Sequence, residues 1–159
     1  MRNEASDRTW QLGSFSLSLK AATEKNVDFC RRVHHEAYRD VVVRQFGSWD
    51  ESLQGKFFLH AWNPSTHDVI HVNEEPAGCL SRIVLPDHIW IAEIQLLPVF
   101  QGRGIGTQIL KQLMNEAARN SISVRLQVLK ANDRALTLYQ RLGLRATGES
   151  DRHFQMEWK

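Results

Sequence analysis

The chain's 159 residues, 42% of them hydrophobic and 24% charged, fit one globular domain that can bury a sizeable core. Its 20 basic and 18 acidic side chains leave a formal charge of +2, and this near balance argues against a nucleic-acid binder or a polybasic membrane binder. Two cysteines are too few for a disulfide framework, so a reducing compartment is the better expectation.

The amino-terminal segment is polar and lacks the apolar stretch of a secretory signal. No apolar run approaches the ~18 residues that a membrane-spanning helix needs. These features predict a cytoplasmic protein with one domain over residues 1–159, in which residues 1–13 form a loose lead-in.

The first half of the chain begins with a strand and two helices. Residues 15–19 alternate apolar and small polar side chains, the period of a half-buried strand. Thr23 offers a cap for a helix whose apolar stripe runs over residues 27–41, and a shorter helix is predicted for residues 50–60. Three strands are then predicted, at residues 69–72, 77–85 and 89–97, the last apolar enough to be covered on both faces.

The second half alternates helices and strands. The predicted elements are a helix at 104–120, a strand at 123–128, a helix at 133–142 and two final strands near 144–148 and 153–158. This order predicts an α/β fold, with a mixed, mostly antiparallel central sheet flanked by helices and one strand–helix–strand crossover.

A glycine-rich loop joins the most apolar strand to the helix at 104–120, and it reads Gln101-Gly102-Arg103-Gly104-Ile105-Gly106-Thr107. Glycine lets backbone amides approach a ligand, and a helix start leaves N–H groups unpaired. The loop therefore predicts a phosphate or pyrophosphate site, against the alternative of a turn with no chemical role. The dinucleotide and ATP-type loop patterns both fail, because Thr107 replaces the third glycine, no acidic residue ends the next strand, and Gly-Lys-Ser/Thr is absent.

Two motifs resemble the GNAT superfamily of acyl-CoA N-acyltransferases. Residues 101–106 match its signature Gln/Arg-x-x-Gly-x-Gly/Ala, and Pro98 lies three residues upstream, as is common there. Residues 132–144 resemble the family's Asn-x-x-Ala-x-x-Leu-Tyr-x-x-Leu-Gly-Phe pattern, with Leu144 replacing the usual Phe. The resemblance implies a GNAT-like fold, with acetyl-CoA as cosubstrate and no metal.

The resemblance also assigns roles to individual positions. Asn132 would contact the cofactor's arm, and Tyr139 would lie near the thioester sulfur and protonate the departing thiolate. Backbone amides that pair with the pantetheine arm would be those of Leu96 and its neighbours, Gln95 and Leu97. The pyrophosphate would be held by the glycine loop, that is by Gln101, Gly102, Arg103, Gly104, Ile105, Gly106 and Thr107.

Direct transfer to an amine requires an ammonium group to lose a proton, so a base is expected. Glu93 is the candidate, because it interrupts an otherwise apolar strand and must face a cleft, pair with a cation or carry a raised pKa. The alternative is an ion pair with Arg82 or Arg125 on a neighbouring strand, and the residues leave both open.

The first predicted helix carries His34, His35, Tyr38 and Arg39, and the resemblance implies that the acceptor pocket is built there. Cys30 and His34 have the spacing of half a metal site, but without a second pair of ligands they predict no metal. Cys30 is instead expected to pack as a small hydrophobic side chain.

The sequence thus predicts an N-acetyltransferase that moves an acetyl group from acetyl-CoA to a primary amine, of a small molecule or a peptide, by direct attack. A homodimer is possible, because family relatives often dimerise. The alternatives are a CoA-binding regulatory module that keeps the scaffold without turnover, and a nucleotide-binding domain. Tyr139, Asn132 and Glu93 favour the enzyme over the regulatory module, because a binding protein needs no acid.

Overall fold

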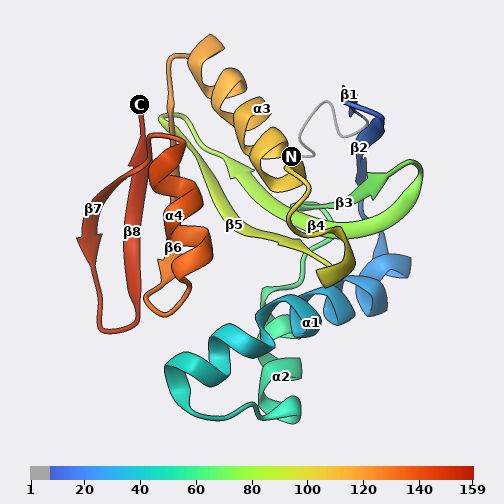
Figure 1. The fold of residues 1–159 in the computed structure, drawn as a ribbon, viewed down its shortest axis with the longest axis vertical. Coiled ribbons are helices and arrows are strands. Elements are labelled where there is room, and N and C mark those ends of the chain that lie inside the picture. The colour runs from blue at the N-terminus through green and yellow to red at the C-terminus, as the bar shows by residue number, and fades with distance from the viewer. Residues whose placement is uncertain (1–7) are drawn as a thin grey trace.

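The computed structural model describes residues 8–159 and contains a single eight-stranded sheet (Figure 1). Its strands are β1 (Arg8–Leu12), β2 (Phe15–Ala21), β3 (His67–Val72), β4 (Glu75–Val84), β5 (His88–Leu96), β6 (Ser123–Leu129), β7 (Arg145–Glu149) and β8 (His153–Trp158). They lie in the order β1-β2-β3-β4-β5-β6-β8-β7, and β5 with β6 is the parallel pair in an otherwise antiparallel ladder of described residues. The predicted mixed, mostly antiparallel sheet is confirmed.

In the part of the chain that the structure describes, four helices accompany the sheet: α1 (Val27–Phe46), α2 (Glu51–Ala61), α3 (Ile105–Arg119) and α4 (Asp133–Arg141). Short 3-10 turns lie at Glu24–Asn26 and Pro98–Phe100. Local signals set the helix ends: Asp50 accepts a hydrogen bond from the Leu53 amide at the start of α2, and Gly47, with φ of +89°, ends α1. All of the helices predicted from the sequence are present.

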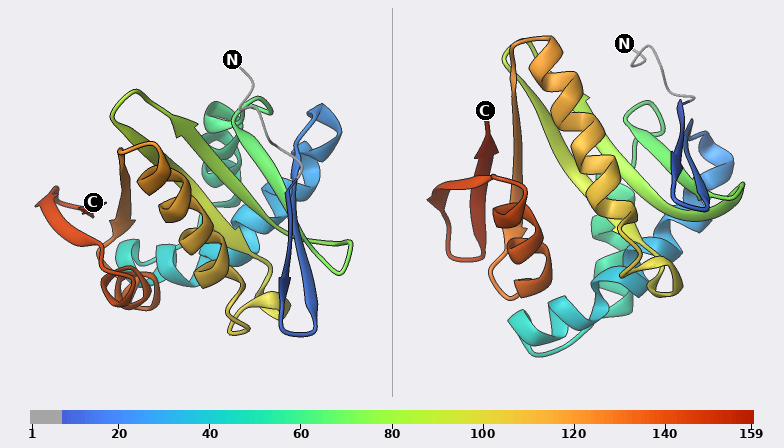
Figure 2. Two further views of the ribbon diagram at one scale, coloured as in Figure 1. Left: turned by 90° about the horizontal axis from the view of Figure 1, so that it is seen from above. Right: turned by 45° about the horizontal axis from the view of Figure 1, so that its top comes forward.

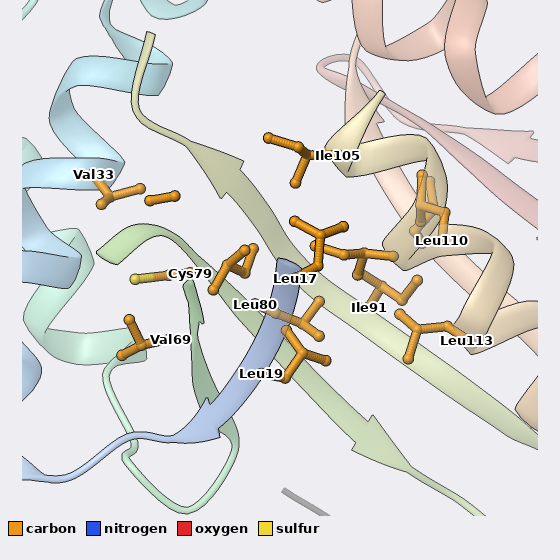
Figure 3. Close-up of a cluster of buried hydrophobic side chains, with 14 of the residues drawn as sticks. Leu17, Leu19, Val33, Val69, Cys79, Leu80, Ile91, Ile105, Leu110 and Leu113 are labelled. Carbon is orange, nitrogen blue, oxygen red and sulfur yellow. The ribbon is translucent and has the colours of Figure 1, made fainter. Parts of the chain in front are cut away.

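Helices α1 and α3 cover opposite faces of the sheet (Figure 2). Successive strand residues point to opposite faces, so Cys79 of β4 faces α1 whereas Leu80 faces α3. Figure 3 shows this division, with Val33 of α1 close to Cys79 and Leu113 of α3 close to Ile91. The buried stripe of α3 consists of Ile105, Ile109, Leu110, Leu113, Met114 and Ala117.

The expected loose lead-in is wrong where the structure can test it. Residues 8–12 form β1, which pairs with β2 across a tight turn at Gly13, with φ of +59°. The side chains of Trp10 and Leu12 pack against the core, and this alternation keeps the strand in register. Residues 1–7 of the lead-in lie outside the described residues.

The cysteines also differ from expectation, because Cys30 of α1 and Cys79 of β4 form a disulfide. Both are buried in the core, as predicted for Cys30, but they are joined rather than separate thiols. They are 49 residues apart in the sequence, so the spacing alone could not reveal that α1 packs over β4 at this point. The bond attaches the amino-terminal part of α1 to the sheet.

Candidate active site

A cleft opens where the two parallel strands separate. Strands β5 and β6 are paired only from His88 with Ser123 to Ile91 with Leu126, after which β5 stays with β4 and β6 stays with β8 (Figure 1). Side chains from both strands and from α1 and α4 line the opening: Tyr38, Ile91, Ala92, Glu93, Ile94, Leu126, Gln127, Val128, Asn132, Ala135 and Tyr139. The fold therefore brings Glu93 of β5 to the same site as Asn132 and Tyr139, which lie much later in the sequence.

A β-bulge in β5 aims Glu93 into this cleft. Ser81 of β4 lies opposite Glu93, and the next residue, Arg82, lies opposite Ile91, so Ala92 is an extra residue on β5. Without the bulge, Ile91 and Glu93 would share a face. With it, Ile91 stays with Arg82 on the α3 face, and Glu93 moves to the face that α1 covers.

This geometry contradicts the ion-pair alternative for Glu93. Arg82 donates to Glu116 of α3 at 2.8 Å, on the opposite face of the sheet. Arg125 lies near the start of β6, away from the cleft, and pairs instead with Glu157 and Asp87. Within residues 8–159, the Glu93 carboxylate has no arginine partner, and it accepts a hydrogen bond of 2.9 Å from Nε2 of Gln95.

Burial without a countercharge shifts the titration of the groups in the cleft. It raises the pKa of Glu93 from 4.5 to about 7. Burial, and then the charge of Glu93, raise the pKa of Tyr139 to about 12. Burial and the same charge also raise the pKa of Tyr38, although a hydrogen bond with Gln95 opposes this shift. Near neutral pH, the site thus combines a carboxylate that can gain or lose a proton with two protonated tyrosines.

Asn132 and Tyr139 reach the cleft from α4. Asn132 caps that helix, and its Oδ1 accepts a hydrogen bond of 3.3 Å from the Ala135 amide. Tyr139 follows two turns later, and both residues line the cleft, as expected of a seven-residue spacing on one helix face.

The glycine loop keeps its backbone accessible. Gly102 and Gly104 have φ of +75° and +79°, which favour glycine, and a Cβ placed on Gly104 or Gly106 would meet no atom within 4 Å. No side chain caps the start of α3, so the first amides of this helix, among them those of Gly106 and Thr107, lack an intrahelical acceptor. This open turn fits an anionic group such as a pyrophosphate.

The side chains of Arg103 and Gln101 in this loop contact other residues of the protein. The Arg103 guanidinium lies over the ring of Phe100, 5.8 Å from its centroid. Gln101 donates through Nε2 to the Leu96 carbonyl at 2.9 Å and accepts from Arg134 of α4 at 3.2 Å. The side chain of Gln101 therefore ties the end of β5 to α4.

The pairing of β5 with β4 determines which backbone amides of β5 remain free to bind a ligand. The Leu97 amide donates to the Ala77 carbonyl at 2.8 Å. Because hydrogen-bonded pairs alternate along an antiparallel ladder, the Gln95 amide also points to β4, whereas the amides of Ile94 and Leu96 point toward the gap left by β6. Of the three expected residues, Leu96 keeps its amide available, and Ile94 is an addition that this alternation reveals.

Tyr38 lines the cleft from α1, the helix on which the resemblance placed the acceptor pocket. Its ring stacks on His34, with 5.3 Å between centroids, and His34 also contacts Phe58 of α2. Burial, followed by the charge of His35, lowers the pKa of His34 to about 4, so the imidazole beside Tyr38 is neutral at pH 7. The His34–Tyr38 spacing of one helical turn is the signal in the sequence.

Within residues 8–159, no cluster of His, Cys, Asp or Glu side chains has an arrangement that could hold a metal ion. Nor does any helix in this part of the chain combine the length and apolarity needed to cross a bilayer.

The chain is similar to known acetyltransferases. Residues 30–144 match the model of the Acetyltransferase (GNAT) family. Thialysine N-epsilon-acetyltransferase of Mus musculus is 35% identical over 65 residues, covering 40% of this chain and 38% of that protein. N-alpha-acetyltransferase RimI of Mycobacterium tuberculosis is 39% identical over 59 residues, covering 37% and 36%. The chain thus spans less than two fifths of the length of these curated relatives.

Solved structures share the fold at low sequence identity. PaiA N-acetyltransferase from Thermoplasma acidophilum, in complex with coenzyme A, has a TM-score of 0.74 at 13% identity and covers 90% of this chain and 98% of its own. The GNAT domain of S. lividans PAT has a TM-score of 0.70 at 14% identity and covers 98% of both chains.

Proposed function

The chain belongs to the acetyltransferase (GNAT) family, and we propose that it transfers the acetyl group of acetyl-CoA to a primary amine, of a small molecule or a peptide. The observation that carries this proposal is the position of Glu93. Its carboxylate lies in the cleft beside Asn132 and Tyr139, has no cationic partner among residues 8–159, and has a pKa of about 7.

The residues of the site fit the cosubstrate. Acetyl-CoA would supply an acetyl group activated as a thioester. The open glycine loop and the uncapped start of α3 suit its pyrophosphate, and a Cβ at Gly104 or Gly106 would find free space there. The Leu96 amide and the side chain of Asn132 would hold the pantetheine arm.

Glu93 would serve as the general base. An alkylammonium with a pKa of ~10.4 is deprotonated about once in 2,500 molecules at pH 7, so removal of this proton is a large part of the barrier. The Glu93 carboxylate takes the proton, directly or through one water, and Gln95 orients the carboxylate. The amine nitrogen is then free to bond to the acetyl carbon.

The remaining groups stabilise the negative charge that develops on the acetyl oxygen and on the sulfur during the reaction. The Ile94 amide, which like that of Leu96 points away from β4, donates to the acetyl oxygen as negative charge accumulates there. As the carbon–sulfur bond breaks, Tyr139 gives its proton to the sulfur. The nitrogen is cationic after the attack and loses a second proton as the amide forms, and this proton restores Tyr139. Glu93 releases to solvent the proton that it took from the ammonium, so the ammonium and acetyl-CoA give the amide, the CoA thiol and one free proton.

The test is a CoA-release assay over a panel of amines, run with wild-type protein, Glu93→Gln and the control Glu75→Gln, which changes an exposed glutamate of β4. We expect release with at least one amine, loss of release in Glu93→Gln and no change in the control. Acetyl-CoA should raise the melting temperature of all three proteins.

Stabilisation by acetyl-CoA without release from any amine would favour a CoA-binding regulatory module instead. Absence of any stabilisation by acetyl-CoA would remove both functions.

A further inference from the structure

One glutamine side chain joins the last turn of α1 to the opposite side of the cleft. Nε2 of Gln45 donates to the Arg152 carbonyl, in the turn between β7 and β8, at 2.9 Å. Oε1 of Gln45 accepts from the Ala131 amide, in the turn between β6 and α4, also at 2.9 Å. Both ends of the side-chain amide are therefore engaged, each with backbone that is distant in the sequence.

Two further contacts lie beside the hydrogen bonds of Gln45. The Lys130 amide donates to the same Arg152 carbonyl at 3.0 Å. The Arg152 guanidinium lies over the ring of Phe46, 5.5 Å from its centroid. We call these five residues, Gln45, Phe46, Lys130, Ala131 and Arg152, the α1 junction.

The α1 junction is adjacent to the groups that line the cleft. Ala131 directly precedes Asn132, which caps α4, the helix that carries Tyr139. Tyr38 lies seven residues before Gln45 on α1, so the two side chains point to the same side of that helix. The α1 junction therefore links the helix of Tyr38 to the helix of Tyr139.

The sheet itself does not set the width of the cleft at this end. Pairing of β5 with β6 stops at Ile91 and Leu126, and Tyr38, Glu93 and Asn132 all lie beyond that point or beside it. At its other end α1 is attached to β4 by the disulfide between Cys30 and Cys79. A link between Arg134 and Gln101 lies on the glycine-loop side. On the α1 side, the contacts of the α1 junction join the two sides of the cleft.

We propose that Gln45 is a positioning residue that sets the separation between the Glu93 and Tyr38 side of the cleft and the Asn132 and Tyr139 side. This inference rests on the proposed function. A side-chain amide suits the role because it donates and accepts at once, whereas an ionised glutamate cannot donate and methionine offers only a weak sulfur acceptor. Gln45 touches no reacting atom and acts through the two helices that it joins.

The expected effect is on turnover more than on binding. A misplacement of about 1 Å can reduce an oriented reaction about 100-fold. We expect Gln45→Met to lower kcat at least about 10-fold and to change the KM for the amine less than about 3-fold. Gln45→Glu, which keeps the acceptor for Ala131, should fall between Gln45→Met and wild type.

The matched control is Gln140→Met, the same substitution at an exposed position of α4, and it should leave kcat unchanged. Hydrogen–deuterium exchange supplies a readout independent of activity, because loss of the Gln45 acceptor should speed exchange at the Ala131 amide. Faster exchange together with the fall in kcat, in a protein that melts as one cooperative unit, supports the proposal.

A folded Gln45→Met protein with kcat within about 2-fold of wild type overturns it. If Gln45→Met does not fold, Gln45→Glu decides by the same criteria. If wild type turns over no amine, the proposed function fails. The positioning role is then decided by the Kd for acetyl-CoA, which Gln45→Met should raise at least about 3-fold through the displaced Asn132; an unchanged Kd overturns it.

Discussion

Glu93 and Glu116 are both largely withdrawn from solvent, but they lie on opposite faces of the sheet and in opposite electrostatic surroundings. Glu116 accepts hydrogen bonds from Arg82 and Arg8, each at 2.8 Å. Burial alone would raise the pKa of Glu116, but the two arginines outweigh it and lower that pKa. Glu93 has no cationic partner among residues 8–159 and accepts a hydrogen bond from the side-chain amide of Gln95, and burial raises its pKa to about 7. The countercharge therefore decides whether the pKa of such a carboxylate is lowered or raised.

The environments of Glu93 and Glu116 depend on residues that are adjacent in the sequence of β4. Arg82, which serves Glu116, is next to Ser81, which lies opposite Glu93. The bulge at Ala92 assigns Glu93 to the cleft and leaves Arg82 to Glu116 on the other face. Each of the following variants changes the environment of Glu93 or that of Glu116.

The largest effect is expected for Glu93→Gln. Removing a general base lowers kcat about 10²- to 10⁴-fold. In wild type, kcat/KM should rise with pH through about 7, because the carboxylate must be deprotonated to accept a proton, and this limb should vanish in the variant. A pH–rate profile that keeps the limb in Glu93→Gln would show that another group titrates.

Arg82→Met should have the largest effect on stability. Arg82 is 1% exposed, and its loss leaves Glu116 without its most buried cation, so the free energy of unfolding should fall by roughly 3–5 kcal/mol. Urea denaturation measures this change. The double variant Arg82→Met/Glu116→Gln should recover part of the loss, and a single-variant loss below about 1 kcal/mol would contradict a buried, essential pair.

The two glutamates should give opposite dependences of stability on pH. Between about 4.5 and 7, folded Glu93 keeps a proton that the unfolded chain releases, so stability falls as pH rises, by at most about 3 kcal/mol. Glu93→Gln should remove this fall. The lowered pKa of Glu116 contributes stability that is present above its unfolded pKa and is lost as pH falls through the folded pKa. Glu116→Gln should therefore weaken the loss of stability at acid pH.

Urea unfolding at a series of pH values tests both slopes. Slopes of the same sign for the two glutamates would refute the contrast between their environments.

The smallest effect is expected for Arg8→Met. Arg8 pairs with the same Glu116 oxygen as Arg82, but it lies on the edge strand β1 and its side chain is 21% exposed, so solvent weakens the interaction. Thermal or urea unfolding should show a loss of about 1 kcal/mol, well below that of Arg82→Met. Equal losses would mean that burial does not distinguish the two arginines.

Local patterns determined much of the fold and part of the site. The apolar stripe of α3, the cap at Asp50 and the alternation in the strands are short-range signals, and each predicted the correct element. Strand β1 was missed, because five residues beside a polar terminus carry too little periodicity. Asn132 and Tyr139 line the cleft together, as their seven-residue spacing on one helix predicted, because that spacing depends on local geometry.

By itself, the sequence therefore determined which elements other than β1 form, in which order, and which side chains share a helix face, because these depend on neighbours within a few residues. The tertiary structure alone decided that Ala92 is bulged, that Glu93 faces α1 and not Arg82, that Cys30 joins Cys79, and that Gln45 reaches Ala131. The physical reason is that strand register and long-range contacts are set by how whole faces pack, and a one-residue shift moves a side chain to the opposite face.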